Sequence, residues 1–104
     1  MTRIELAKIE LANGVLADFD RFVEHLASFE SSNASDRISE IIEAIQILAH
    51  SPLIGRKVKG GKRELVIGRD SRGYVALYRF VPQIDTVFVL ALRSQRELGF
   101  PAGR

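Results

Sequence analysis

The sequence lacks cysteine and tryptophan, and its 104 residues include only two histidines and three prolines. Without cysteine, neither a disulfide framework nor a thiolate metal site is available, and a reducing compartment is permitted. No apolar run approaches the roughly 20 residues that span a bilayer, and the first residues, Met1 to Leu6, lack the apolar segment of a signal peptide. We therefore expect a cytoplasmic protein that folds as a single domain over residues 1–104.

Charge is distributed unevenly along the chain. Residues 1–50 contain four Lys/Arg and nine Asp/Glu, a balance of −5, whereas residues 51–104 contain eleven and four, a balance of +7; the sum is the net charge of +2. A basic half on a small protein favours a phosphate-rich or acidic partner. The alternatives are that the two halves pair with each other or that the cations are simply solvated.

Three strand-like segments rich in β-branched and aromatic residues follow one another in the second half: Glu64–Gly68, Tyr74–Val81 and Thr86–Leu92. Residues 70–73 and 82–85 supply the glycine, proline and aspartate typical of turns. The sequence therefore predicts a three-stranded antiparallel meander. Residues 3–12 fit either an added edge strand at the N-terminus or a helical turn.

Two apolar stripes at helical spacing precede these strands. The first helix is predicted after Asn13-Gly14 and ends near Glu30; its stripe consists of Val15, Leu16, Phe19, Phe22, Val23, Leu26 and Phe29. The second is capped by Ser35 or Asp36 and ends at Ser51-Pro52; its stripe consists of Ile38, Ile41, Ile42, Ile45 and Leu48. Such stripes must be buried, so we expect an α+β fold in which a helical hairpin packs on one face of the small antiparallel sheet.

Both faces of the predicted sheet are apolar. Strict alternation places Val75, Leu77 and Arg79 opposite Tyr74, Ala76 and Tyr78, and it groups Val87 with Val89. One helical layer covers only one face, so the second must be covered by the C-terminal tail, by self-association or by a partner protein that lays an amphipathic segment across it.

Residues 53–62 are predicted to form a loop. Its Lys59-Gly60-Gly61-Lys62 run lacks the spacing of a phosphate-binding loop and precedes a strand instead of a helix. The cations of this region are candidates for binding nucleic acid or another target: Arg56, Lys57, Lys59, Lys62 and, beyond the loop, Arg69.

Catalytic constellations are sparse. His25 and His50 lie within predicted helices, where structural roles are the usual ones, and no His/Asp/Glu set has metal-ligand spacing, so no metal or cofactor is expected. Ser71 and Ser94 have no candidate base at a recognisable spacing. Tyr74 and Tyr78, interleaved with arginines, could stack a base, although tyrosines that alternate on a strand are more often core residues.

The order of helix, helix, loop and meander, with the Ser-Pro-Leu-Ile-Gly-Arg segment at 51–56, Gly73-Tyr74 and Gln95-Arg96-Glu97, resembles the RelE/ParE superfamily of bacterial toxins. The resemblance covers nearly the whole chain. It implies the toxin of a type II toxin–antitoxin module, often associated with plasmid stabilization, which inhibits growth until a cognate antitoxin binds it. We expect that antitoxin to contact Val75, Leu77, Arg79, Val87 and Val89.

The resemblance leaves two targets open, because one branch of the superfamily poisons DNA gyrase and the other cleaves messenger RNA on the ribosome. RNA cleavage without a histidine pair needs several cations converging on one phosphate. Arg63 and Arg96 match recurrent basic positions and Arg93 is near, so these three form the candidate catalytic set. Leu65, Ile67 and Val75 occupy places where the cleaving branch has basic residues, and Ser94 replaces a histidine. A different class is also open: a member without toxicity that acts as a protein-binding or DNA-regulatory module.

Overall fold

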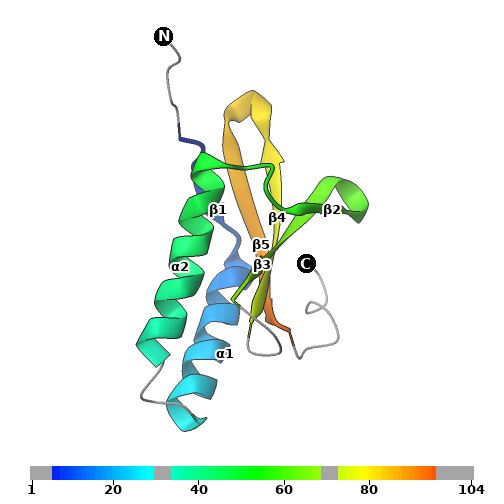
Figure 1. The fold of residues 1–104 in the computed structure, drawn as a ribbon. Coiled ribbons are helices and arrows are strands. Elements are labelled where there is room, and N and C mark those ends of the chain that lie inside the picture. Colours follow the sequence, from blue (N-terminus) through cyan, green and yellow to red (C-terminus); the bar gives the residue numbers. More distant parts are fainter. Residues whose placement is uncertain (1–5, 30–33, 69–72, 96–104) are drawn as a thin grey trace.

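A computed structural model describes residues 6–29, 34–68 and 73–95. The elements in chain order are β1 (Lys8–Leu11), α1 (Asn13–Phe29), α2 (Ala34–His50), β2 (Arg56–Val58), β3 (Lys62–Ile67), β4 (Tyr74–Val81) and β5 (Thr86–Ser94). The predicted α+β fold is confirmed, with both helices on one side of the sheet (Figure 1). No helix in the described ranges is long and apolar enough to cross a membrane.

The sheet has five strands in the order β1-β5-β4-β3-β2. The predicted meander is its centre, since β3, β4 and β5 pair antiparallel in sequence order. The N-terminal segment is the edge strand that the sequence left open, and it runs parallel to β5. The prediction that residues 53–62 form only a loop is wrong. Arg56–Val58 is the strand β2, which pairs antiparallel with β3, and a 3-10 turn at Lys59–Gly61 joins the two strands.

The turn between β4 and β5 forms as the sequence indicates. Pro82–Ile84 is a single 3-10 turn, and Asp85 adopts a left-handed conformation with φ of 49°. The Asp85 N–H donates to the Pro82 carbonyl at 3.1 Å. Aspartate is one of the few residues that tolerate this conformation, so the chain reverses tightly into β5. The other predicted turn, at residues 70–73, lies almost wholly outside the described residues.

The core lies between the helices and one sheet face. α1 packs on β5, and α2 packs on β1, β3 and β5. The cluster is formed by Ala7 before β1, by Val15 of α1, by Ile41, Ala44, Ile45 and Leu48 of α2, and by the sheet residues Ile67, Tyr74, Ala76, Tyr78, Val87, Val89 and Leu92. Two residues of the predicted stripes, Leu16 and Ile42, are instead 55% and 44% exposed, because each lies at the outer edge of its stripe.

A β-bulge in β5 reverses the side-chain alternation that the sequence predicts for this strand. Leu77 pairs with Ala91 while Tyr78 pairs with Val89, so Leu90 is an extra residue between them. A bulge of one residue moves every later side chain to the other face. Val87, Val89 and Leu92 therefore face the helices, and Ala91 and Arg93 face away.

Two side chains of α1 form hydrogen bonds with the backbone of β5 where this strand continues beyond its pairing with β1. The β1–β5 pairing ends at Val89, whose carbonyl accepts the Ala12 N–H. Farther along, the Leu92 N–H donates to Asp18 Oδ2 at 2.9 Å, and Arg21 Nη2 donates to the Leu92 carbonyl at 3.4 Å. Asp18 and Arg21 thus take the place of a neighbouring strand, which explains how a carboxylate only 1% exposed is accommodated.

Candidate functional site

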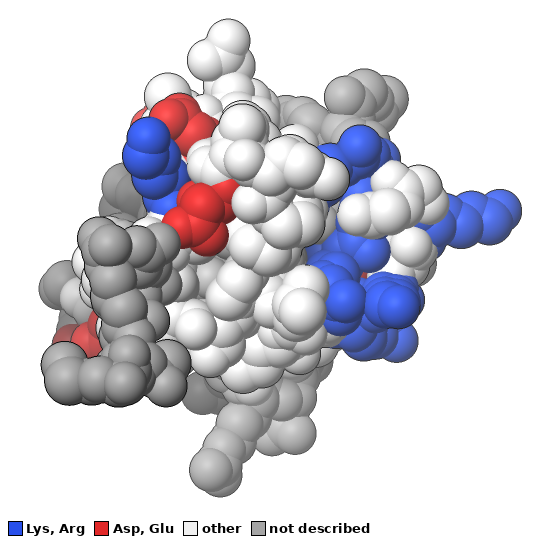
Figure 2. All heavy atoms as spheres, turned by 90° about the horizontal axis from the view of Figure 1, so that it is seen from above, with Lys and Arg blue, Asp and Glu red and all other residues white. Residues whose placement is uncertain are grey.

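The cations of the second half gather on the hairpin formed by β2 and β3. In the view from above, most of the visible Lys and Arg side chains lie together on the side where Figure 1 shows β2, whereas the visible Asp and Glu lie mainly toward the helices, beside a single cation (Figure 2). The hairpin contributes Arg56, Lys57, Lys59, Lys62 and Arg63 against one carboxylate, Glu64, and Arg79 of the adjoining β4 raises the local balance from +4 to +5. The structure therefore brings together four of the five predicted target-binding residues. The fifth, Arg69, lies outside the described residues.

The turn of this hairpin is narrow because of its two glycines. Gly60 and Gly61 both have positive φ, 77° and 71°, a conformation that disfavours any residue with a Cβ atom. Arg79 Nη2 donates to the Gly60 carbonyl at 2.8 Å and so fixes the turn to β4. The Gly-Gly pair therefore shapes a compact tip.

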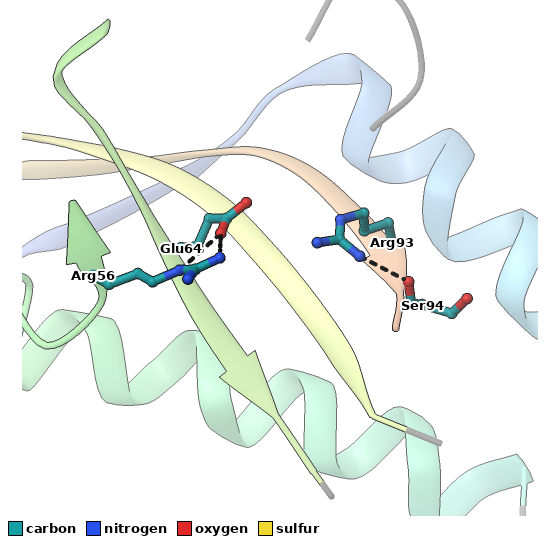
Figure 3. A network of polar contacts seen from close by, with 4 residues as sticks. All are labelled: Arg56, Glu64, Arg93 and Ser94. Atoms are coloured by element: carbon teal, nitrogen blue, oxygen red, sulfur yellow. Dashed lines mark hydrogen bonds and ion pairs between the residues drawn. The ribbon is translucent and has the colours of Figure 1, made fainter. Parts of the chain in front are cut away.

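One cation of the hairpin has a carboxylate partner. Arg56 and Glu64 are direct neighbours across β2 and β3, and Arg56 Nη2 and Nε donate to Glu64 Oε1 at 2.7 and 3.1 Å (Figure 3). The Arg56 side chain is 73% exposed and that of Glu64 only 11%, so the largely buried carboxylate is neutralised by an arginine that reaches it from the surface through two donors. Within the described part of the chain, no carboxylate pairs with Lys57, Lys59 or Lys62.

Arg63 holds the segment that leads from α2 into β2. Its Nη1 donates to the carbonyls of Leu53 and Gly55, at 3.2 and 2.8 Å. Close by, the Gly55 N–H donates to the hydroxyl of Tyr78 at 2.8 Å. Burial raises the pKa of Tyr78, an effect opposed by this N–H and by the charge of Arg63. Arg63, Gly55 and Tyr78 thus form a hydrogen-bonded junction between the hairpin and the core, with Gly55 and Tyr78 buried and Arg63 partly exposed.

The predicted catalytic set is not assembled by the described residues. Arg63 of β3 pairs with Tyr78 and faces the helices, whereas Arg93 of β5 pairs with Val75 and faces away. These positions differ by about 10 Å along the strands and by about 10 Å across them. Arg93 Nη1 donates to the neighbouring Ser94 carbonyl at 3.2 Å (Figure 3). The third member, Arg96, lies outside the described residues.

The residues predicted to contact an antitoxin are divided between the two faces of the sheet. Val75, Leu77 and Arg79 lie on the face away from the helices, and Arg79 is exposed. Val87 and Val89 belong to the helix-covered core and are fully buried, so the five residues predicted for one antitoxin contact do not share one face. The cause is the register that the turn at residues 82–85 sets, in which Val87 pairs with Phe80 and Val89 with Tyr78, a helix-facing residue. Val75 and Leu77 are themselves only 2% and 6% exposed.

Tyr74 and Tyr78 are also core residues, 5% and 0% exposed, which excludes base stacking by either ring in this conformation. No group of three or more potential metal ligands occurs among the described residues. Sequence reasoning missed two features, the Asp18 and Arg21 contacts to β5 and the Gly55–Tyr78 junction. The signal for the first was present, because Asp18 lies three residues after Val15 on the apolar side of α1.

The fold is similar to that of toxin–antitoxin structures from three bacteria. The chromosomal ParDE system from P. aeruginosa matches with a TM-score of 0.73 and 18% identity, over 86% of this chain and 96% of that chain. The RelBE2 complex from Mycobacterium tuberculosis matches with a TM-score of 0.61 and 16% identity, over 93% and 100%. The intact E. coli RelBE complex matches with a TM-score of 0.54 and 16% identity, over 85% and 95%. The helical hairpin on a five-stranded sheet is thus a RelE/ParE-like toxin fold.

Within that class the sequence is more specific. Residues 9–99 match the family described as ParE toxin of the type II toxin–antitoxin system, parDE. The chain therefore belongs to the ParE toxin family. No curated protein sequence matches it.

Proposed function

We propose that this chain arrests growth as the toxin of a two-gene toxin–antitoxin pair, that a cognate antitoxin neutralises it, and that its target is DNA gyrase and not messenger RNA on the ribosome. Membership of the ParE toxin family supports the toxin role. The similar solved structures are of toxin–antitoxin systems, which supports an antitoxin partner.

The choice of target depends chiefly on the positions of Arg63 and Arg93. Cleavage of a phosphodiester without histidine requires cations that converge on one phosphate, since the developing negative charge must be met from a fixed direction. Arg63 lies against two backbone carbonyls, and Arg93 lies on the opposite sheet face. A target bound through surface contacts makes no such demand, so the gyrase role is the one that this arrangement supports.

The test separates the two targets in one experiment. The chain is expressed from a tightly controlled promoter, with a matched reading frame carrying an early stop codon as the control. We expect growth arrest with continued protein synthesis and accumulated gyrase-linked DNA breaks. Co-expression of the neighbouring antitoxin frame should restore growth. Purified chain should inhibit supercoiling by purified gyrase.

Two results would contradict the proposal. Rapid loss of protein synthesis with transcripts cut in frame would show a ribosome-dependent nuclease and return Arg63, Arg93 and Arg96 to consideration as catalytic residues. Normal growth at full expression of folded protein would indicate instead the non-toxic binding module.

A further inference from the structure

The hairpin β2–β3 presents cations on both of its faces and at its tip. Lys57 is paired with Arg63 and lies on one face, whereas Lys62 lies on the other face together with Arg56. Lys59 is in the connecting turn and is exposed. A flat binding surface would need cations on one face only. Cations on both faces suit a ribbon that is inserted between two negatively charged walls.

We propose that this hairpin binds double-stranded DNA by entering the major groove tip first, with its lysines contacting the phosphates of both groove walls. A β-ribbon with side chains on both faces is about 10 Å thick, and the major groove of B-DNA is about 12 Å wide and admits a two-stranded ribbon. The Gly60-Gly61 turn keeps the leading end free of bulk. Figure 1 shows this turn projecting from the sheet on the side away from the helices.

Other nucleic acids fit the hairpin less well. The major groove of A-form RNA is deep and too narrow for side-chain access. Single strands are commonly bound by stacking bases on exposed aromatic rings, and the two tyrosines nearest the hairpin are buried. The charged side chains suit backbone contacts, so the binding should be independent of base sequence.

The lysines are the residues available for this contact. Arg56 is engaged by Glu64, Arg63 by two carbonyls and Arg79 by the turn itself. Lys57 and Lys59 are exposed and Lys62 is partly exposed. Three lysine–phosphate contacts predict that log K falls with log salt concentration at a slope of about −2.7, which is about a 40-fold loss of affinity between about 50 and 200 mM salt.

The test uses the full chain without antitoxin, because the antitoxin could itself bind DNA. Binding to a fluorescein-labelled DNA duplex of about two helical turns is followed by anisotropy across that salt range. In the variant with Lys57→Ala, Lys59→Ala and Lys62→Ala, we expect the affinity to change less than about twofold with salt and to be at least about tenfold weaker than that of the parent at low salt. Circular dichroism verifies that each variant is folded.

A matched control keeps the hairpin and makes the same change in net charge. Lys8→Ala, Ser39→Glu and Gln46→Glu alter exposed positions on β1 and α2 and also lower the net charge by three, through one cation removed and two carboxylates added. The control should keep the parent slope. Equal losses in the two variants would assign the effect to net charge and overturn the proposal. Single Lys57→Ala and Lys62→Ala changes should each reduce the slope by about 0.9; an effect from only one face would refute entry between two walls.

The nucleic acid is tested with an RNA duplex of the same sequence. Weaker binding to RNA supports the groove geometry, and equal or tighter binding overturns the commitment to duplex DNA. The inference is independent of the proposed target, since no gyrase is present in the assay. Growth arrest by a chain that does not bind DNA, or DNA binding by a chain that does not arrest growth, would separate the two proposals.

Discussion

Replacing Asp18 should destabilise the whole domain, because this residue lies on the side of α1 that is turned toward the sheet. Asp18 is 1% exposed, and its Oδ2 accepts the N–H of Leu92, a residue that is itself fully buried. In Asp18→Ala the carboxylate is gone, and no side-chain acceptor remains for that N–H. A buried donor left unsatisfied costs about 1–3 kcal/mol, and a hydrogen bond to a charged group contributes about 1.5–3 kcal/mol. These two figures describe the same contact, so we expect a loss of about 3 kcal/mol in the free energy of unfolding.

The ion pair with Arg21 adds little to that figure. Arg21 Nη1 lies 3.7 Å from Asp18 Oδ1, and the arginine side chain is 42% exposed, so solvent screens the attraction. Asp18→Asn keeps an oxygen acceptor for Leu92 and loses mainly this charge. Its expected cost is therefore about 1 kcal/mol. The contrast between the two variants measures the hydrogen bond separately from the charge.

The assay is thermal and urea unfolding followed by circular dichroism. A loss of 3 kcal/mol lowers the melting temperature of a domain of this size by about 12–24 °C. Asp20→Ala is the control, since Asp20 is an exposed aspartate on the same helix, and its change should stay within about 0.5 kcal/mol. Amide exchange should also be faster at Leu92 in Asp18→Ala. If Asp18→Ala were no more destabilising than Asp20→Ala, the view that α1 replaces a strand neighbour of β5 would be refuted.

Two further predictions concern the junction of the hairpin with the core. A Cβ atom added at Gly55 would lie 2.7 Å from the Glu64 carbonyl oxygen and from Tyr78 Cε1 and Oη, so Gly55→Ala should cost about 1–3 kcal/mol in urea unfolding; an unchanged urea midpoint would show that this close approach is absent. Burial raises the pKa of Tyr78 above 10.0, which means that its neutral form stabilises the fold fully below pH 10 and that this contribution is lost as the pH rises through the folded-state pKa. Tyr78→Phe should therefore show a smaller fall in unfolding free energy above pH 10 than the parent, and parallel curves for the two proteins would contradict this assignment.

The central elements were predictable from sequence because each has a strong local signal. β4 occupies Tyr74–Val81 as expected, between turn residues at both ends. α1 and α2 follow from apolar stripes that can be buried only against the sheet. β2 could not be predicted in the same way, since its three residues include two cations and no alternation can be detected over so short a length. Its pairing with β3 depends on the Gly60-Gly61 turn and on the Arg56–Glu64 contact, which appear only once the strands are side by side.

The distribution of functional residues depended on two features that a linear pattern does not contain. The turn register places Val89 opposite Tyr78 and so in the core, and the bulge at Leu90 then makes Arg93 face away from the helices. The position of a β5 residue before or after the bulge therefore decides on which face of the sheet its side chain lies. Arg63 is a comparable case, because its basic character suggested catalysis while its environment is two backbone carbonyls. Its charge is used to hold the base of the hairpin.

This arrangement links the stability of the hairpin to its availability for binding. Arg56, Arg63 and Arg79 each contact another part of the chain, and together they hold β2, the segment before it and the turn after it in one geometry. The three lysines make no such contact with the described residues. Arginine suits the first role because its planar group donates to several acceptors at once, whereas a lysine on a flexible stem can follow a phosphate. Because the arginines make structural contacts and the lysines do not, replacing the lysines should weaken partner binding with little effect on folding. Replacing Arg63 should instead loosen the hairpin itself.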